Sequence, residues 1–231
     1  YNLHDQRTIF GTEGFHVPAT ISFLSPAYNA ERDYNDVRIK AIKVINRMNR
    51  ALQEYIPNQV GRFDDSYNVN CSGDFFSTNA TPTILFEAGH FPNDYNREES
   101  RKYVFIALLN SFLITDENAL ETSNLDEYLR IPQNNIFFFD FIYKNVKIID
   151  NKIEKIINFA AQYQEELIDD KISFIAVISK ISDLDNFSGH VEYDCELLLF
   201  SSQGKNLPAI GEKATFNLNN LTFFNNGEKI I

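Results

Sequence analysis

Two short stretches of the chain place a reactive polar side chain directly after an apolar, strand-like segment. In the first stretch His4 follows Leu3, and in the second Glu87 follows an apolar run that ends at Phe86. Open α/β sheets build their sites where strands end. A neutral imidazole is a good zinc ligand, and partial burial raises the pKa of a carboxylate towards the range of a general base. Each residue also has an ordinary interpretation, His4 as a surface or hydrogen-bonded residue and Glu87 as an ion-pair partner.

Two more residues lie close to these candidates in the sequence. Arg7, three residues after His4, either points into the same cleft or pairs with an acidic neighbour. His90, three residues after Glu87, orients a substrate group, takes part in metal binding, or is a loop residue with a backbone partner.

The remaining candidates are acidic residues and isolated histidines. Asp64 and Asp65 resemble a paired-carboxylate site, but adjacent residues of a turn seldom aim at one point, which favours a solvated loop. His16 and His190 have no companion residues and are expected to be structural. Asp140 lies in the apolar run FFFDFIY and needs a hydrogen-bond partner if it is buried.

The elements that must position these residues alternate between strand and helix. Residues 19–25 and 81–89 read as β-rich apolar runs. A helix is expected over 33–56, because apolar residues recur there at steps of three and four, and Pro57 ends it. The residues on its apolar face are Val37, Ala41, Ile42, Ile45, Met48, Leu52 and Ile56.

A second helix is expected over 96–113, capped by Asn96 with Glu99 three residues later. Strand, helix, strand and helix in succession predict an α/β fold, a mixed sheet flanked by helices.

A change of character at about residue 130 predicts two units, 1–130 and a smaller, β-rich unit over 131–231. A polar, acidic connection is expected around 115–135. One helix is expected in the second unit, with Ile153, Ile156, Ile157, Ala160 and Leu167 on its inner side.

The rest of the second unit is expected to be strands, at 171–179, 190–200, 214–218 and 221–224. In 190–200, Val191, Tyr193, Cys195 and Leu197 alternate with acidic residues, which predicts a half-buried antiparallel strand.

Composition limits the class of protein. The chain has 231 residues and is 44% hydrophobic and 14% aromatic, enough for a sizeable core. Its 21 Lys and Arg residues against 32 Asp and Glu residues give a net charge of −11, which argues against nucleic acid or an anionic membrane as a partner. An acidic surface by itself indicates only solubility.

Cysteine usage and the termini leave the compartment open. Cys71 and Cys195 have no metal-type or redox spacing, so they are either free thiols or one disulfide. No run of about 18 apolar residues occurs, so no transmembrane helix is expected, and the first residues lack the basic-then-apolar pattern of a signal peptide. The first residue is Tyr1 rather than Met, so a removed export signal stays open, although a cytoplasmic location is favoured.

Three motifs resemble a known family when they are taken together. The segments NLHDQR (2–7), GRFDDSYNVNCSGDFF (61–76) and PTILFEAGHF (82–91) occur in the same order as motifs of the zinc carboxypeptidase family, the carboxypeptidase A type. The chain resembles a bacterial member over roughly residues 1–113. The resemblance implies a zinc-carboxypeptidase-like fold and hydrolysis of C-terminal peptide bonds.

The resemblance also implies roles for individual residues. It makes His4 the third zinc ligand, Glu87 the general base, and Tyr67, which precedes Ser72-Gly73, a residue that caps the substrate. One zinc ion held by two His and one Glu keeps a position open for water, the arrangement of carboxypeptidase A. The metal acidifies that water and polarises the scissile carbonyl, and Glu87 takes up the water proton.

The sequence departs from the family pattern before His4. The family has a His-x-x-Glu pair there, which supplies two zinc ligands, and an Asn-Arg pair for the terminal carboxylate. Here no histidine is followed by Glu three residues later, and Asn96-Arg97 follows Glu87 and reads as a helix cap. We therefore expect the C-terminal part of a catalytic domain whose two other ligands lie upstream, with little or no activity on its own.

Three functions fit these observations. The first is a zinc metallocarboxypeptidase acting on peptides. The second is a deacylase or amidase on the same fold, which acts on acylated small molecules and keeps the zinc and the Glu but has a changed substrate clamp; an upstream Asn-Arg pair favours the carboxypeptidase over it. The third is a non-catalytic binding or scaffold domain that has lost the metal site, and an upstream His-x-x-Glu pair separates it from the first two.

Overall fold

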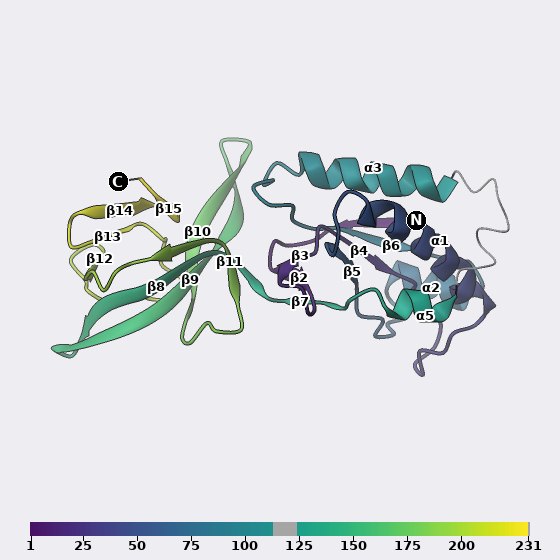
Figure 1. Cartoon of the computed structure of the whole chain (residues 1–231), viewed down its shortest axis with the longest axis horizontal. Coiled ribbons are helices and arrows are strands. Elements are labelled where there is room, and N and C mark those ends of the chain that lie inside the picture. The colour runs from purple at the N-terminus through teal and green to yellow at the C-terminus, as the bar shows by residue number, and fades with distance from the viewer. Residues whose placement is uncertain (113–123, 231) are drawn as a thin grey trace. The chain divides into compact units, whose positions relative to one another are not determined.

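The computed structural model describes residues 1–112 and 124–230 (Figure 1). The chain divides into two compact units, Tyr1–Ile136 and Phe137–Ile231. The division falls after residue 130 because β7 (Asn134–Ile136) pairs antiparallel with β2 (Phe10–Thr12) and so belongs to the first unit. The polar connection expected around 115–135 lies partly outside the described residues.

The first unit is a mixed α/β structure with two sheets. Strands β1, β6, β4 and β5 form a mixed sheet in that order, in which β1 is parallel to β6, β6 antiparallel to β4, and β4 parallel to β5. Strands β3, β2 and β7 form a small antiparallel sheet. The elements in chain order are β1 (Asn2–Asp5), β2, β3 (Val17–Pro18), β4 (Ile21–Leu24), α1 (Asp36–Gln53), β5 (Val60–Arg62), α2 (Ser72–Thr78), β6 (Leu85–Ala88), α3 (Glu98–Phe112), α5 (Leu125–Leu129) and β7.

Helix α1 forms where the apolar periodicity predicts it. Asn35 caps it by accepting a hydrogen bond from the backbone N–H of Arg38 at 3.0 Å. Its buried apolar face packs, together with α3, on the side of the sheet that carries Phe23 and Phe86. The rings of Phe23 and Phe86 meet edge to face at 5.0 Å. Met48, fully buried on this face, is core packing, as expected.

Helix α3 is confirmed, but its predicted cap is wrong. The carboxylate of Asp94, rather than the side chain of Asn96, accepts hydrogen bonds from the backbone N–H groups of Glu98 and Ser100, at 2.9 and 3.0 Å. The reason is that Arg97 adopts a left-handed conformation (φ 62°), so the chain turns sharply just before the helix. This turn brings Asp94 under the first N–H groups.

The second unit consists of two four-stranded sheets that pack on each other. Their orders are β10-β9-β8-β11 and β12-β13-β14-β15. The strands are β8 (Phe138–Asp150), β9 (Ile153–Ile168), β10 (Lys171–Ile181), β11 (Ser188–Asp194), β12 (Phe200–Ser201), β13 (Phe216–Leu218), β14 (Thr222–Asn225) and β15 (Glu228–Lys229). An aromatic core joins the sheets: the ring of Tyr143 lies 5.0 Å from that of Phe216 and 5.3 Å from that of Phe224.

The helix predicted between Ile153 and Leu167 is wrong, because this segment is the long strand β9. Two-residue hairpin loops precede and follow it, Asn151-Lys152 with φ of 50° and 68°, and Asp169-Asp170 with φ of 49° and 60°. Positive φ at both loop residues is the type I′ geometry that joins twisted antiparallel strands. The isoleucines are also β-branched and suit a strand.

The strand predicted as antiparallel within 190–200 is β11, which pairs parallel with β8. Alternation of burial holds from Val191 to Cys195, but Leu197 is exposed. The alternating pattern is the same for either strand direction, so it could not reveal the parallel pairing. Within the described ranges, no helix has the length and apolar character needed to cross a membrane.

Candidate functional site

His4 and Glu87 lie side by side in the mixed sheet. They are Cα partners in the parallel ladder of β1 and β6, and Glu87 is also the partner of Ser22 in β4. Directly opposed residues of neighbouring strands direct their side chains to the same face. His4 is exposed, whereas Glu87 is 7% exposed. The sheet therefore sets an accessible imidazole next to a buried carboxyl.

The surroundings of Glu87 change its proton affinity. Burial, and secondarily the negative charge of Asp5, raise the pKa of Glu87 from 4.5 to about 7. A carboxyl group with this pKa both accepts and donates a proton readily at neutral pH, which is what a general acid–base group requires.

Arg97 ties together the chain segments that follow the two strands. Its guanidinium donates hydrogen bonds to the carbonyl oxygens of Ala88 at 3.1 Å, Gly89 at 2.7 Å and Gln6 at 2.9 Å. It also lies 3.4 Å from the carboxylate of Asp5. One cation thus satisfies carbonyls from both strand ends, a role that sequence reasoning missed because it depends on tertiary contacts. The left-handed backbone of Arg97 has no clear sequence signal.

Gly89 lets these segments approach closely. A Cβ atom at this position would lie 1.9 Å from the carbonyl oxygen of Ala19 and 2.9 Å from the amide oxygen of Gln6. Both distances are impossible for a real side chain, so only glycine allows this packing. The Gly of the motif FEAGH is therefore explained by packing at the end of β6.

An apolar cavity of about 310 Å³ lies on the α3 side of the sheet. Leu3 and Phe86 line it from the strands, Phe105 and Leu108 line it from α3, and His4 borders it. Because successive strand residues point to opposite faces, Leu3 and Phe86 face this cavity, whereas the side chain of Glu87 points to the other face of the sheet.

Tyr67 and Arg7 are not linked by polar contacts to the paired residues His4 and Glu87 among the residues that the structure describes. The hydroxyl of Tyr67 lies 3.3 Å from the hydroxyl of Thr78 in α2, and Arg7 is exposed. Across residues 1–112 and 124–230, no hydrogen bond or ion pair connects either residue with His4 or Glu87.

Asp65 belongs to an ion pair. Its carboxylate accepts a hydrogen bond from the guanidinium of Arg38 at 2.9 Å and lies 3.5 Å from that of Arg32, while Asp64 is exposed. Arg38 is fully buried and also donates to the carbonyl oxygen of Ser25 at 2.8 Å. Asp64 and Asp65 do not form a carboxylate pair, since only one of them turns inward.

The other candidates have structural partners. His90 is buried, its ring lies 4.8 Å from that of Tyr95, and its backbone oxygen accepts a hydrogen bond from Thr20. His190 stacks on Phe138 at 4.8 Å. His16 is exposed, with a left-handed backbone (φ 52°).

Asp140 has the partners that its burial requires. Its carboxylate accepts hydrogen bonds from the side chain of Gln162 and from the backbone N–H of Tyr163, the latter at 2.7 Å. The two cysteines are free, Cys71 exposed and Cys195 buried, and burial raises the pKa of Cys195 to about 12.

In the part of the chain that the structure describes, no three His, Cys, Asp or Glu side chains gather in a way that could hold a metal ion. No family model, curated protein or solved structure matches the chain. The candidate site is therefore defined by its geometry, a paired His4 and Glu87 held by Arg97.

Proposed function

We propose that this chain contributes His4 and Glu87 to the active site of a zinc-dependent metallocarboxypeptidase. The observation that carries the proposal is the pairing of these two residues in adjacent parallel strands, with the pKa of Glu87 at about 7. The three motifs that resemble the zinc carboxypeptidase family contain both residues, and they supply the reaction class.

The described residues do not form a zinc site by themselves. A hydrolytic zinc site takes three protein ligands and leaves one position for water. His4 is one such donor, and the described residues lack a cluster that supplies the others. On this proposal two further ligands come from upstream of His4, where the family has its His-x-x-Glu pair, so the metal affinity of the 231-residue chain alone is low.

Glu87 is the group that moves a proton. Its raised pKa lets it take a proton from an attacking water and return that proton to the leaving amine. Asp5 contributes by keeping the proton affinity of Glu87 high, since a nearby anion disfavours a second negative charge.

Arg97 and Gly89 are positioning residues in this proposal. Arg97 anchors the carbonyls that follow β1 and β6, and Gly89 allows the segment after Glu87 to pack against Ala19. Fixed strand ends matter because a small displacement of an acid–base group lowers the rate steeply.

Substrate panels separate the peptidase from a deacylase with the same two residues. The test uses the longest product of the reading frame that contains this chain, with peptides that end in a free carboxylate, matched C-terminal amides and N-acyl amino acids. Zinc-dependent release of the terminal residue from the free-carboxylate peptides alone supports a carboxypeptidase. Cleavage of the N-acyl compounds alone supports a deacylase, and no zinc-dependent cleavage of any substrate contradicts both.

A further inference from the structure

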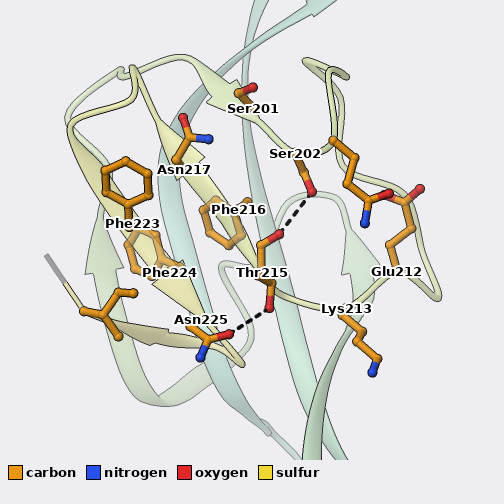
Figure 2. A pocket seen from close by; sticks show the side chains of 12 residues that line it. Ser201, Ser202, Glu212, Lys213, Thr215, Phe216, Asn217, Phe223, Phe224 and Asn225 are labelled. Atoms are coloured by element: carbon orange, nitrogen blue, oxygen red, sulfur yellow. Dashed lines mark hydrogen bonds between the residues drawn. The ribbon is translucent and has the colours of Figure 1, made fainter.

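The outer face of the sheet β12-β13-β14-β15 carries a groove of about 610 Å³ (Figure 2). Phe216 and Phe224 also border it, but their rings are almost completely buried in the core between the two sheets. Strand register places Ser201, Asn217 and Phe223 in one row across the outer face, because Ser201 pairs with Asn217 and Asn217 with Phe223. The groove therefore runs across three strands.

A flat apolar ring and amide groups stand together in this groove. Phe223 is half-buried, and Figure 2 shows its ring close to Asn217, with Asn225 and Thr215 farther along the same face. An aromatic ring exposed in a groove packs well against the C–H face of a flat ligand. The neighbouring amides and hydroxyls supply hydrogen bonds around it.

The chain itself orients the two amide groups. The side-chain oxygen of Asn217 accepts a hydrogen bond from the backbone N–H of Asn220 at 3.0 Å, and that of Asn225 accepts from the hydroxyl of Thr215 at 3.4 Å. Within the described ranges, the Nδ2 groups of both asparagines have no hydrogen-bond partner. Two fixed N–H donors are thus available to a ligand, and their preorganisation lowers the entropic cost of binding.

The charges of the groove argue against an ionic ligand. Glu212 is paired with Lys205 at 2.6 Å, and Lys213 is the cation that lines the groove. A phosphate or other strongly anionic ligand calls for several convergent cations, which this groove does not provide among the described residues. Strands β13 and β14 are interior strands whose backbone groups are paired in the sheet, so an extended peptide gains no backbone ladder here.

We propose that this groove binds a neutral carbohydrate chain. One pyranose ring stacks on Phe223, and its hydroxyl oxygens accept hydrogen bonds from the Nδ2 groups of Asn217 and Asn225. The groove belongs to the second unit and uses neither His4 nor Glu87, so the proposal does not depend on the proposed peptidase activity. It would make the second unit a polysaccharide-binding module.

Affinity electrophoresis of the 231-residue chain in gels that contain β-glucan, xylan, mannan or starch tests the proposal. We expect retardation by at least one of these neutral polysaccharides. Phe223→Ala, and separately the double variant Asn217→Ala/Asn225→Ala, should weaken binding at least about tenfold. The control is Leu221→Ala, because Leu221 is 70% exposed near the same strands but does not line the groove.

Circular dichroism shows whether each variant is folded, and the double variant keeps the test valid if Phe223→Ala unfolds. Retardation lost in the groove variants and kept in Leu221→Ala supports the proposal. Absence of retardation in all four gels, or equal retardation of the wild type and both groove variants, would overturn it. Binding of peptides instead of polysaccharides, lost in Phe223→Ala, would also overturn it by making the groove a peptide site.

Discussion

His4 and Glu87 are register partners in two adjacent parallel strands, although 82 positions separate them in the sequence. This pairing sets an exposed imidazole beside a carboxyl group whose pKa is about 7. Neither residue alone indicates a functional site, since an exposed histidine and a buried glutamate are each common. Their juxtaposition at one sheet face is what gives the proposed site its chemistry.

The buried carboxyl of Glu87 should make the stability of the chain fall as the pH rises. Its pKa is about 7 in the folded chain and 4.5 as an unperturbed group, so between these values the folded state binds more protons than the unfolded state. Ionisation of the buried Glu87 therefore does not lower the free energy of unfolding below pH 4.5, and its full destabilising effect is reached above pH 7. Glu87→Gln removes this cost, so its stability advantage over the wild type should grow by about 1 to 3 kcal/mol between pH 4.5 and pH 8.

Urea unfolding at pH 4.5, 6 and 8 measures this difference. Glu99→Gln is the matched control, because the hydrogen bond from Lys102 lowers rather than raises the pKa of that exposed glutamate. A difference for Glu87→Gln that stays constant across this range would show that Glu87 ionises normally.

The three carbonyl contacts of Arg97 should make this residue important for stability. Arg97→Ala removes charge-assisted hydrogen bonds to Ala88, Gly89 and Gln6 and should lower the free energy of unfolding by about 2 to 4 kcal/mol. The left-handed backbone affects both residue types similarly, so it does not account for the loss.

Arg101→Ala provides the comparison for Arg97. The guanidinium of Arg101 forms an exposed pair with Glu98 in α3, so its removal should change the free energy of unfolding by less than about 0.5 kcal/mol. Denaturant midpoints measure both variants, and equal midpoints for the two would contradict the role given to Arg97.

Substitution of Gly227 and of Gly204 by Ala distinguishes the stability cost of a steric clash from the cost of an unfavourable backbone conformation. Both have positive φ, 90° and 79°, but a Cβ at Gly227 would lie 2.3 Å from the ring of Phe141, whereas one at Gly204 meets nothing within 4 Å. Gly204→Ala should cost about 1 kcal/mol from backbone strain alone. Gly227→Ala should cost at least about 2 kcal/mol more, because the core ring must move.

Thermal unfolding of both glycine variants measures these costs. The carbonyl of Gly227 also accepts a hydrogen bond from the buried hydroxyl of Tyr143 at 2.6 Å, so displacement of this turn disturbs the aromatic core. Similar losses at the two positions would mean that the turn at Gly227 relaxes freely.

The sequence predicts those elements whose signals are local. The period of apolar residues in α1 and the apolar run of β6 are sufficient, because each describes the burial of one element. Strand β9 is not predicted by its local signals, because its isoleucines fall at steps that also fit a helix. In addition, Asn151-Lys152 and Asp169-Asp170 are not the usual glycine-containing hairpin turns.

The candidate site could likewise be predicted from the sequence only in part. The positions of His4 and Glu87 at strand ends can be inferred from apolar runs, but their pairing depends on strand order, which skips from β1 to β6. The partners of Arg97, Asp65 and Asp140 come from distant segments, so no local pattern indicates them.

Hydrolysis by Glu87→Gln in the longest product of the reading frame, with bound zinc quantified in the same sample, tests the central claim most directly. A general base typically contributes about 10² to 10⁴ in rate. The proposal predicts that release of the C-terminal residue falls by at least about 10²-fold while the zinc content per chain is unchanged. Hydrolysis at the wild-type rate by the zinc-loaded variant would contradict the assignment of Glu87 as the general base.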